Sequence, residues 1–328
     1  MLIVRYLAAG ERTAGIGVMT GEEVRPLAVA SMADLLGHTL EEIRRLLERA
    51  SAASPIVGPV RLLPPVDGRM EVWGAGVTYE RSRSARMAES SEADVYDRVY
   101  DADRPELFFK SAAWRVVTTG EPIAIREDST IDVPEPELAV VGNSRGVVVG
   151  YLVCDDVSSR SIEGANPLYL PQAKVYAGAC ALSQGVRPVW EVSSPDALDV
   201  ELTIVRDGET VWRGAVTTAE LRRRPADLLA HLFAAEQFPD GAVLSTGTGI
   251  VPELDFSLLE HDVVTVRIEQ VGALINTVVR GKQSFAWLAE ELGERPPVVR
   301  PAPERVAVPD RAAAHPAQAG YLDRGVSR

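Results

Sequence analysis

Apolar residues at the start of the chain form short alternating runs that are separated by turn residues. The runs span Leu2–Leu7, Gly15–Met19 and Glu23–Val29, which predicts three strands of a small sheet. Leucines and Ile43 then recur three or four positions apart between residues 35 and 47, and this spacing predicts an amphipathic helix. Thr39, with Glu42 three residues later, is a capping box for its second part. We therefore predict a small N-terminal α+β domain over residues 1–66, with a proline-rich linker from 54 to 68.

The next part of the chain predicts a larger domain over residues 67–285, in which strands predominate. Val72–Val77 has the pattern of a buried strand, and its two glycines permit close backbone approach. The polar run from Glu80 to Asp101 has helical composition; it is either a lid over a site or, more commonly, a solvated face. Further strands are predicted around Leu107–Phe109 and at Gly146–Cys154.

Scaffold elements follow in the second half of this domain. A hairpin is predicted on either side of Asp207-Gly208, then an amphipathic helix over 219–233 and two closing strands at 263–269 and 274–279. The last segment, 286–328, is rich in Pro, Ala and Arg, a composition that predicts a flexible tail. The fold class is thus α+β, predominantly β.

Charge and cysteine content narrow the classes of partner. The formal net charge of −13 and the pI near 4.9 oppose binding to nucleic acid, which requires clustered Lys and Arg. No apolar run approaches the length of a membrane span or a signal peptide. The two cysteines, Cys154 and Cys180, lie in apolar runs and suit a reducing compartment. We expect a cytoplasmic protein with no nucleic-acid or membrane partner.

Candidate chemistry centres on the stretch VPEPELAVV. Side chains two positions apart on a strand project to the same face about 7 Å apart, so Glu135 and Glu137 can converge on one cation. Pro134 and Pro136 favour a segment that is open on one side. Carboxylate oxygens suit Mg²⁺, Mn²⁺ or Ca²⁺. The plain alternative is two solvated carboxylates at a sheet edge.

A third acid strengthens the metal-site interpretation. A four-residue turn at 143–146 joins the E-x-E segment to the strand ending at Asp155 and Asp156, and antiparallel pairing returns these acids toward Glu137. Buried carboxylates need a cation or hydrogen-bond donors. For Asp155 we favour a cap of the following turn, and for Asp156 a ligand role.

The series WGAGVTYE, ELFFK, PEPELAVV, GYLVCDDVSSR, NPLYLPQAKVYAG and STGTG resembles the fumarylacetoacetate hydrolase family, in particular its 2-dehydro-3-deoxy-D-arabinonate dehydratase branch. The resemblance runs from about residue 71 to 279 and implies a mixed β-sheet roll. It implies that Glu135, Glu137 and Asp156 hold Mg²⁺. It also implies that Lys174 faces the substrate and that Glu106 acts as an acid or base. A homodimer or homotetramer is implied as well.

Departures from the hydrolytic members of the family favour the dehydratase branch. Those members carry a histidine shortly after an Asn-Tyr pair, whereas here Thr78-Tyr79 is followed by Glu80, and no histidine lies between His38 and His231. A hydrolase would need another base for water at neutral pH. Three functions stay open: a Mg²⁺-dependent dehydratase, a hydrolase or decarboxylase of an acylpyruvate, and a non-catalytic metal-binding protein.

For the dehydratase, the expected reaction converts 2-dehydro-3-deoxy-D-arabinonate into 2,5-dioxopentanoate and water, within oxidative pentose degradation. Mg²⁺ would chelate the carboxylate and 2-oxo oxygens of this 2-oxo acid and make C3 acidic. Lys174, with a pKa lowered by desolvation and the nearby cation, is the expected C3 base, and Glu106 the acid for the C4 hydroxyl. The two roles are interchangeable on sequence alone.

Other positions are candidates for substrate binding. Gln172 in the rigid NPLYLPQ loop is expected to meet a hydroxyl, and the amides and Thr248 hydroxyl of STGTG to bind the carboxylate. Tyr79 and Lys110, which belong to the family motifs, complete the set. The arginines at 81, 83 and 115 are either carboxylate clamps or ordinary surface charges, and the second interpretation is favoured.

Overall fold

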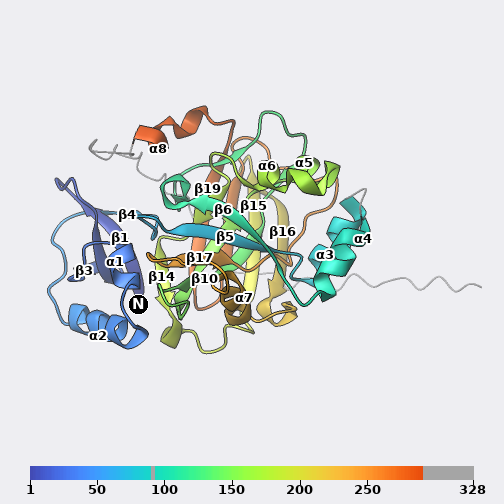
Figure 1. Ribbon diagram of the computed structural model, residues 1–328. Coiled ribbons are helices and arrows are strands. Elements are labelled where there is room, and N and C mark those ends of the chain that lie inside the picture. Colours follow the sequence, from blue (N-terminus) through green and yellow to red (C-terminus); the bar gives the residue numbers. More distant parts are fainter. Residues whose placement is uncertain (90–92, 291–328) are drawn as a thin grey trace, which may run out of the picture.

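A computed structural model describes residues 1–89 and 93–290 of the chain (Figure 1). The N-terminal unit is shown in blue at one end of the molecule. Its elements are β1 (Leu2–Ala8), β2 (Gly15–Thr20), β3 (Glu23–Pro26), α1 (Met32–Leu36), α2 (Leu40–Ser51) and β4 (Val60–Leu63). The capping box of Thr39 and Glu42 is present at the start of α2. The predicted linker therefore contains a strand, because β4 pairs with β1.

The largest sheet joins the N-terminal unit to the rest of the molecule. Its main path runs β3-β2-β1-β14-β11-β10-β17-β5-β6, and β1 pairs antiparallel with β14. The strands beyond β1 are β5 (Glu71–Gly76), β6 (Glu106–Ala112), β7 (Val117–Thr118), β10 (Pro136–Gly142), β11 (Val148–Asp156), β13 (Cys180–Leu182), β14 (Gly185–Pro188) and β17 (Ala242–Ser245). Strands from before and after residue 66 thus belong to one hydrogen-bonded sheet. The division into two domains at that residue stays a prediction.

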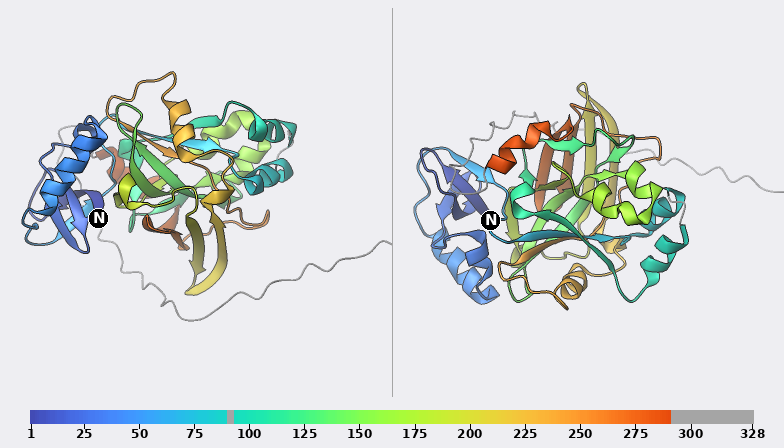
Figure 2. Two further views of the ribbon diagram at one scale, coloured as in Figure 1. Left: turned by 90° about the horizontal axis from the view of Figure 1, so that it is seen from below. Right: turned by 45° about the horizontal axis from the view of Figure 1, so that its top comes forward.

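A second sheet packs against the first and completes the predominantly β fold that the sequence predicts. Its order is β16 (Glu209–Thr217), β15 (Asp199–Arg206), β18 (Val263–Ile268), β19 (Gly272–Arg280) and β8 (Ile123–Ile125). A short ladder pairs β9 (Asp132–Val133) with β12 (Ser158–Ser159). Figure 2 shows the β15–β16 hairpin in yellow, projecting from the body of the molecule. Asp207 and Gly208 both have positive φ at its tip, as the predicted turn requires.

Strand β10 is buried on both faces. Leu138 and Val140 belong to the core shared with the second sheet, whereas Ala139 and Val141 belong to the core that includes the N-terminal helices. Such a strand has a continuous apolar run instead of an alternating one. β10 pairs with β11 along its whole length but with β17 only over 139–142, so Pro136 and Glu137 have a strand partner on one side only, as predicted. The alternative of solvated carboxylates is wrong, because Glu135 and Glu137 are buried.

The remaining helices lie around these sheets. They are α3 (Glu80–Glu89), α4 (Ala93–Asp101), α5 (Arg160–Ala165), α6 (Leu170–Lys174), α7 (Pro225–Leu232) and α8 (Ala286–Glu290). α7 is shorter than the predicted helix because Pro225 stands at its first position. Leu288 of α8 is buried, so an ordered helix occupies the start of the segment predicted as a tail, and its remainder, 291–328, lies outside the described residues.

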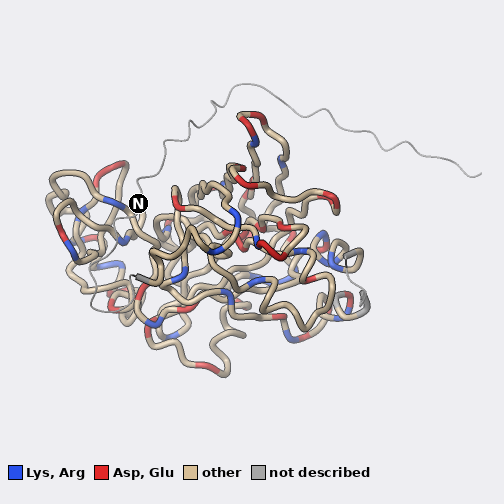
Figure 3. The backbone as a smooth tube through the Cα atoms, turned by 90° about the horizontal axis from the view of Figure 1, so that it is seen from above, with Lys and Arg blue, Asp and Glu red and all other residues tan. Residues whose placement is uncertain are grey.

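Charged residues of both signs are spread over the described chain. Figure 3 shows Lys and Arg positions scattered among Asp and Glu positions. Within residues 1–89 and 93–290, none of the helices has the length and apolar character needed to cross a bilayer.

Candidate metal centre and its cavity

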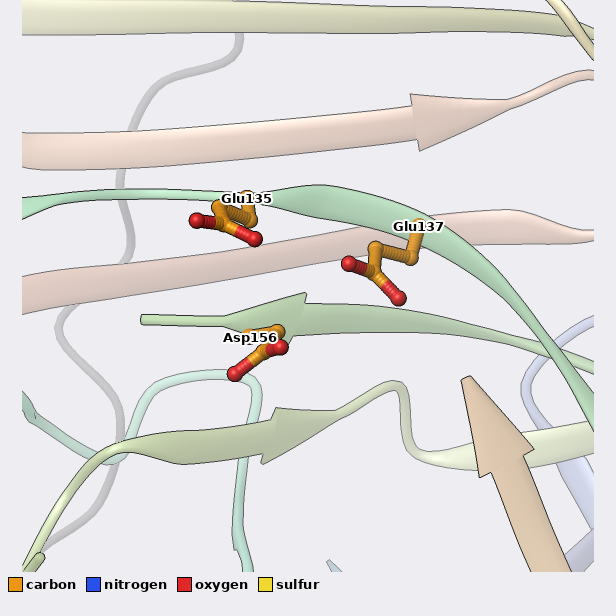
Figure 4. Close-up of side chains that lie close together, drawn as sticks. All are labelled: Glu135, Glu137 and Asp156. Carbon is orange, nitrogen blue, oxygen red and sulfur yellow. The ribbon is translucent and has the colours of Figure 1, made fainter. Parts of the chain in front are cut away.

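Three carboxylates converge at the end of the β10–β11 hairpin. Glu137 lies in β10, Glu135 directly before it, and Asp156 is the last residue of β11. The amide of Asp156 donates to the carbonyl oxygen of Glu135 over 2.9 Å, which brings the strand ends together. One oxygen from each side chain lies within 4.8 Å of the others, and all three residues are buried. Figure 4 shows the three side chains pointing toward one another from neighbouring strands.

Cationic groups surround two of these acids. Glu135 accepts from Lys174 Nζ at 2.8 Å and from Arg86 Nη2 at 2.6 Å. Although burial opposes its ionisation, these two cations lower the pKa of Glu135 to about 2. Asp156 accepts from Lys174 Nζ at 3.2 Å and forms a second ion pair with Lys110.

Glu137 has weaker compensation. Its Oε2 accepts from Ser245 Oγ at 2.5 Å and from the amide of Gly247 at 2.8 Å. Burial and the neighbouring acids Asp156 and Glu135 nevertheless raise the pKa of Glu137 well above its usual range. The cluster therefore favours additional positive charge beside Glu137. A divalent cation with oxygen ligands fits this donor set, since its charge would stabilise three ionised carboxylates together.

Lys174 stands at the edge of the cluster. It ends the short helix α6, is 3% exposed, and its Nζ also donates to Ser158 Oγ at 2.6 Å. Burial alone would lower the pKa of this ammonium group, but Asp156 and Glu135 outweigh burial and hold it above its usual value. Asp156 and Glu135 thus favour the ammonium form of Lys174, whereas the lowered pKa predicted from the sequence includes the opposing effect of a nearby divalent cation.

Glu106 faces the same space from another strand. It is the first residue of β6 and pairs with Gly76 of β5. Burial raises the pKa of Glu106, whereas Arg86 and Lys174 act against this rise. A Cβ atom on residue 76 would lie 2.1 Å from Glu106 Oε2, so the carboxylate occupies space that only glycine leaves free.

These groups share one cavity. Its wall also includes parts of α3, α5, the start of α6 and the segment after β17. The lining includes the four acids and the lysine predicted from the sequence, Glu106, Glu135, Glu137, Asp156 and Lys174. The other lining residues include Ser82, Ala85, Arg86, Phe108, Arg160, Glu163, Leu170, Thr248, Ile250 and Val251. Charged groups are therefore combined with apolar walls, as in a small-molecule site.

The predicted substrate-binding residues divide between the wall and positions behind it. Thr248 lines the cavity, and its hydroxyl is within hydrogen-bond distance of the backbone of Ile250. The neighbouring Gly247 amide binds the protein's own Glu137 carboxylate. Tyr79 is buried, lies outside the cavity lining, and would collide with a Cβ on Gly249.

Two further predictions for substrate contact are not matched by the placement of the side chains. Gln172 is exposed and outside the cavity lining, because a residue two positions from Lys174 on a helix points to the opposite side. Lys110 is fully buried at the bulge in β6, where it contacts Asp156 and donates to the carbonyl oxygens of Val157 and Lys174. Its position is that of a support for the cluster.

Asp155 does not cap the following turn. Its Oδ1 accepts from the amide of Glu135 at 2.9 Å, which fixes the segment carrying the first ligand. The cap of α5 is supplied by Ser159. Strand pairing places Asp155 opposite Pro136, so its side chain lies beside the preceding amide, that of Glu135.

Arg86 and Glu163 were not singled out from the sequence. Arg86, on the polar helix α3, connects Glu135 to Glu163 with contacts of 2.6 and 3.0 Å. A helix rich in charged residues gives no signal for one inward-facing arginine. The spacing of Glu163 from Asp156, across the start of α5, likewise forms no recognised motif.

Comparison with known proteins agrees with this geometry. A family model described as fumarylacetoacetate (FAA) hydrolase C-terminal matches residues 71–279. The chain is 43% identical over 232 residues to a 2-dehydro-3-deoxy-D-arabinonate dehydratase of Saccharolobus solfataricus, covering 69% of this chain and 77% of that protein. It is 50% identical over 214 residues to a probable 2-keto-3-deoxyxylonate dehydratase of Haloferax volcanii, covering 65% and 73%.

A solved structure shows the same fold. It is a 2-keto-3-deoxy-D-arabinonate dehydratase complexed with magnesium and 2,5-dioxopentanoate, with a TM-score of 0.74, 34% identity and coverage of 86% of this chain and 100% of that one. The matched family model spans more than half of the sequence and includes the three carboxylates. The protein therefore belongs to the fumarylacetoacetate hydrolase family.

Proposed function

We propose that this protein is a Mg²⁺-dependent dehydratase that converts 2-dehydro-3-deoxy-D-arabinonate into 2,5-dioxopentanoate and water. The observation that carries the proposal is the convergence of Glu135, Glu137 and Asp156 beside Lys174 in one cavity with Glu106. The relatives of the same family that are named dehydratases, with 43% and 50% identity, support this choice of reaction.

The three carboxylates would hold the metal ion. Bound Mg²⁺ supplies Lewis acidity toward the carboxylate and 2-oxo oxygens of a 2-oxo acid, which makes the C3 protons removable. Lys110 holds Asp156 in place, and Ser245 and the Gly247 amide orient Glu137. These contacts preorganise the ligands before the substrate enters.

The protein's own groups would move the protons. Lys174 Nζ lies beside two of the ligands and is the proposed base for C3. A bound divalent cation would offset the carboxylates that hold its ammonium form, so that the amine could accept this proton. Glu106 is the proposed acid for the departing C4 hydroxyl, since burial favours its protonated form. The apolar walls formed by Phe108, Leu170 and Ile250 exclude competing water.

One assay distinguishes the dehydratase from a hydrolase or decarboxylase on the same fold. The purified protein is given 2-dehydro-3-deoxy-D-arabinonate, its L-epimer or an acylpyruvate, each with and without Mg²⁺. We expect Mg²⁺-dependent formation of 2,5-dioxopentanoate from the first compound. Pyruvate from the acylpyruvate, without turnover of either deoxy acid, would overturn the proposal and favour the hydrolase.

A second assay tests the role of Lys174. Lys174→Met is expected to retain its fold and to lose exchange of C3 protons with deuterated water, as followed by NMR. Lys282→Met, which removes an exposed lysine outside the cavity, is the matched control and should exchange at the normal rate. Exchange retained in Lys174→Met would assign the C3 base to another group.

The homodimer or homotetramer and the cytoplasmic location expected from the sequence belong to the same proposal. Sedimentation of the purified protein would test the first, and fractionation of the cells that produce it the second.

A further inference from the structure

Glu163 is a buried acid in the cavity to which the reaction outlined above gives no role. It lies on α5, is 3% exposed and lines the same cavity as Glu106 and Lys174. Its Oε2 lies 3.0 Å from Arg86 Nη1 and 4.0 Å from Lys174 Nζ. A buried carboxyl group beside the reacting groups is a candidate for proton transfer.

The chemistry requires more proton transfers than Lys174 and Glu106 perform in the loss of water. Removal of a C3 proton and of the C4 hydroxyl leaves a compound with a C3–C4 double bond and a CH₂OH group at C5. An aldehyde at C5 forms only after a C5 proton is removed and protons are added at C3 and C4. This second half is an isomerisation, so it needs no oxidant and releases no further group.

Position along the substrate separates Glu163 from Lys174. A 2-oxo acid chelated through its C1 and C2 oxygens extends C3, C4 and C5 progressively away from the metal ligands. Lys174 contacts Glu135 and Asp156 directly, whereas Glu163 is not part of the cluster whose oxygens lie within 4.8 Å of one another. Glu163 contacts Arg86 and lies 4.0 Å from Lys174 Nζ, and both of these cations contact the cluster. It would therefore face the distal carbons of a substrate that extends from the metal ligands past Lys174.

We propose that Glu163 is the acid–base group for the isomerisation that follows water loss, an inference that rests on the proposed dehydratase function. Its carboxylate takes a proton from C5, and the C5–H electron pair becomes the C4–C5 double bond. The C3–C4 π pair becomes the C2–C3 double bond, and the 2-oxo oxygen takes up the negative charge. Protonation of C3 restores the 2-oxo group and leaves a C4–C5 enol.

The last step regenerates the starting state of the protein. C4 of the enol takes a proton, its C5 hydroxyl loses one, and the C4–C5 π pair forms the new C4–H bond as the aldehyde appears. The two protons lost, from C5 and from the C5 hydroxyl, are thereby balanced by the two protons added at C3 and C4. One carboxyl group that gains and loses a proton can serve each of these transfers.

The surroundings of Glu163 suit such a group. Burial raises the pKa of Glu163 to about 7, and this rise persists although Arg86 and Lys174 oppose it. Glu135 and Glu106 act in the same direction as burial. Near neutral pH both forms of the carboxyl group are accessible, which is the condition for efficient acid–base catalysis.

The deciding experiment uses Glu163→Gln, which removes the charge and keeps the size. In single-turnover reactions with Mg²⁺, we expect water loss within a few-fold of the unmodified protein but aldehyde formation slower by roughly 10²–10⁴-fold. The conjugated 5-hydroxy-2-oxo-3-enoate should accumulate, visible by its ultraviolet absorbance and by NMR. Aldehyde formation at the normal rate, with no accumulation, would overturn the inference.

Two further variants separate a catalytic from a structural role. Glu163→Asp retains an acid and should restore part of the aldehyde formation, with a larger primary isotope effect from substrate deuterated at C5. Arg86→Gln keeps Glu163 and removes its partner. Two results together would contradict the assignment. The first is that Arg86→Gln accumulates as much enoate as Glu163→Gln does, and the second is that Glu163→Asp shows no change in the C5 isotope effect. Glu163 would then act only through Arg86.

The same measurements separate this inference from the proposed function. If the unmodified protein does not remove water from the deoxy acid, the dehydratase proposal fails and the role of Glu163 fails with it. If water is lost but Glu163→Gln yields aldehyde normally, only the role of Glu163 fails. Glu209→Gln, on the projecting hairpin, controls for the loss of one carboxylate elsewhere.

Discussion

The carboxylate of Glu106 occupies the space beside Gly76 that the Cβ atom of any other residue would fill. Gly76→Ala is therefore expected to displace Glu106 and to lower kcat by roughly 10²–10⁴-fold, the usual worth of a positioned acid. Mg²⁺ binding should change little, because the three atoms nearest to the added Cβ all belong to Glu106 and none to the proposed ligands. Steady-state kinetics and a magnesium titration would measure both.

A double variant tests whether Gly76 acts through Glu106. If it does, Gly76→Ala added to Glu106→Gln should reduce kcat by little more than Glu106→Gln alone. If the kcat of the double variant is instead reduced by the product of the two single reductions, Gly76 affects catalysis independently of Glu106.

Glu135→Gln is expected to abolish Mg²⁺ binding. A ligand that binds only the folded state stabilises it by about 2.7 kcal/mol at a concentration 100 times its Kd. The unmodified protein should therefore unfold at a higher temperature with Mg²⁺, whereas Glu135→Gln should not respond. Glu269→Gln, an exposed change in the turn between β18 and β19, should respond normally. A full response in Glu135→Gln would remove Glu135 from the ligand set.

Lys110→Met should destabilise the protein by about 3–5 kcal/mol, since it leaves Asp156 without one partner of a fully buried ion pair. It also removes the donor to the carbonyl oxygens of Val157 and Lys174. Urea denaturation would measure the loss, and Lys282→Met should lie within about 0.5 kcal/mol of the unmodified protein. An equally small effect of Lys110→Met would contradict its role as a support.

Asp132 should make stability depend on pH. Burial raises its pKa from 3.8 to about 6, so the folded state binds the proton more tightly than the unfolded state. The stabilisation of the folded state by this tighter proton binding is fully present below pH 4 and is lost as the pH rises through 6. Asp132→Asn should match the unmodified protein at pH 4 and exceed its free energy of unfolding by about 1–3 kcal/mol at pH 8. Equal stability at pH 8 would contradict the assignment.

Sequence patterns located the carboxylate cluster better than its surroundings. The spacing of Glu135 and Glu137, with the hairpin that returns Asp156, predicted a cluster that the structure brings together. The family and the predominantly β fold were confirmed as well. Each of these predictions depends on local spacing or on a motif, which a single sequence contains.

Features that depend on contacts between distant segments were missed. The central position of β10 follows from pairing with β17, more than 100 residues later in the chain. Arg86 is set apart from the other arginines of α3 only by the direction in which it points. For Lys174, the sequence could not show that several acids would outweigh desolvation in its effect on the pKa.

The three proposed ligands come from one hairpin, whereas Glu106, Lys174 and Arg86 reach the cavity from separate segments. The site therefore has two parts that are encoded in different segments of the chain. Substitutions in α3, β6 or α6 would alter which bond reacts and which substrate fits, while the hairpin would keep its three carboxylates for the ion. The groups that choose the reaction and the groups that hold the ion can thus be varied independently of each other.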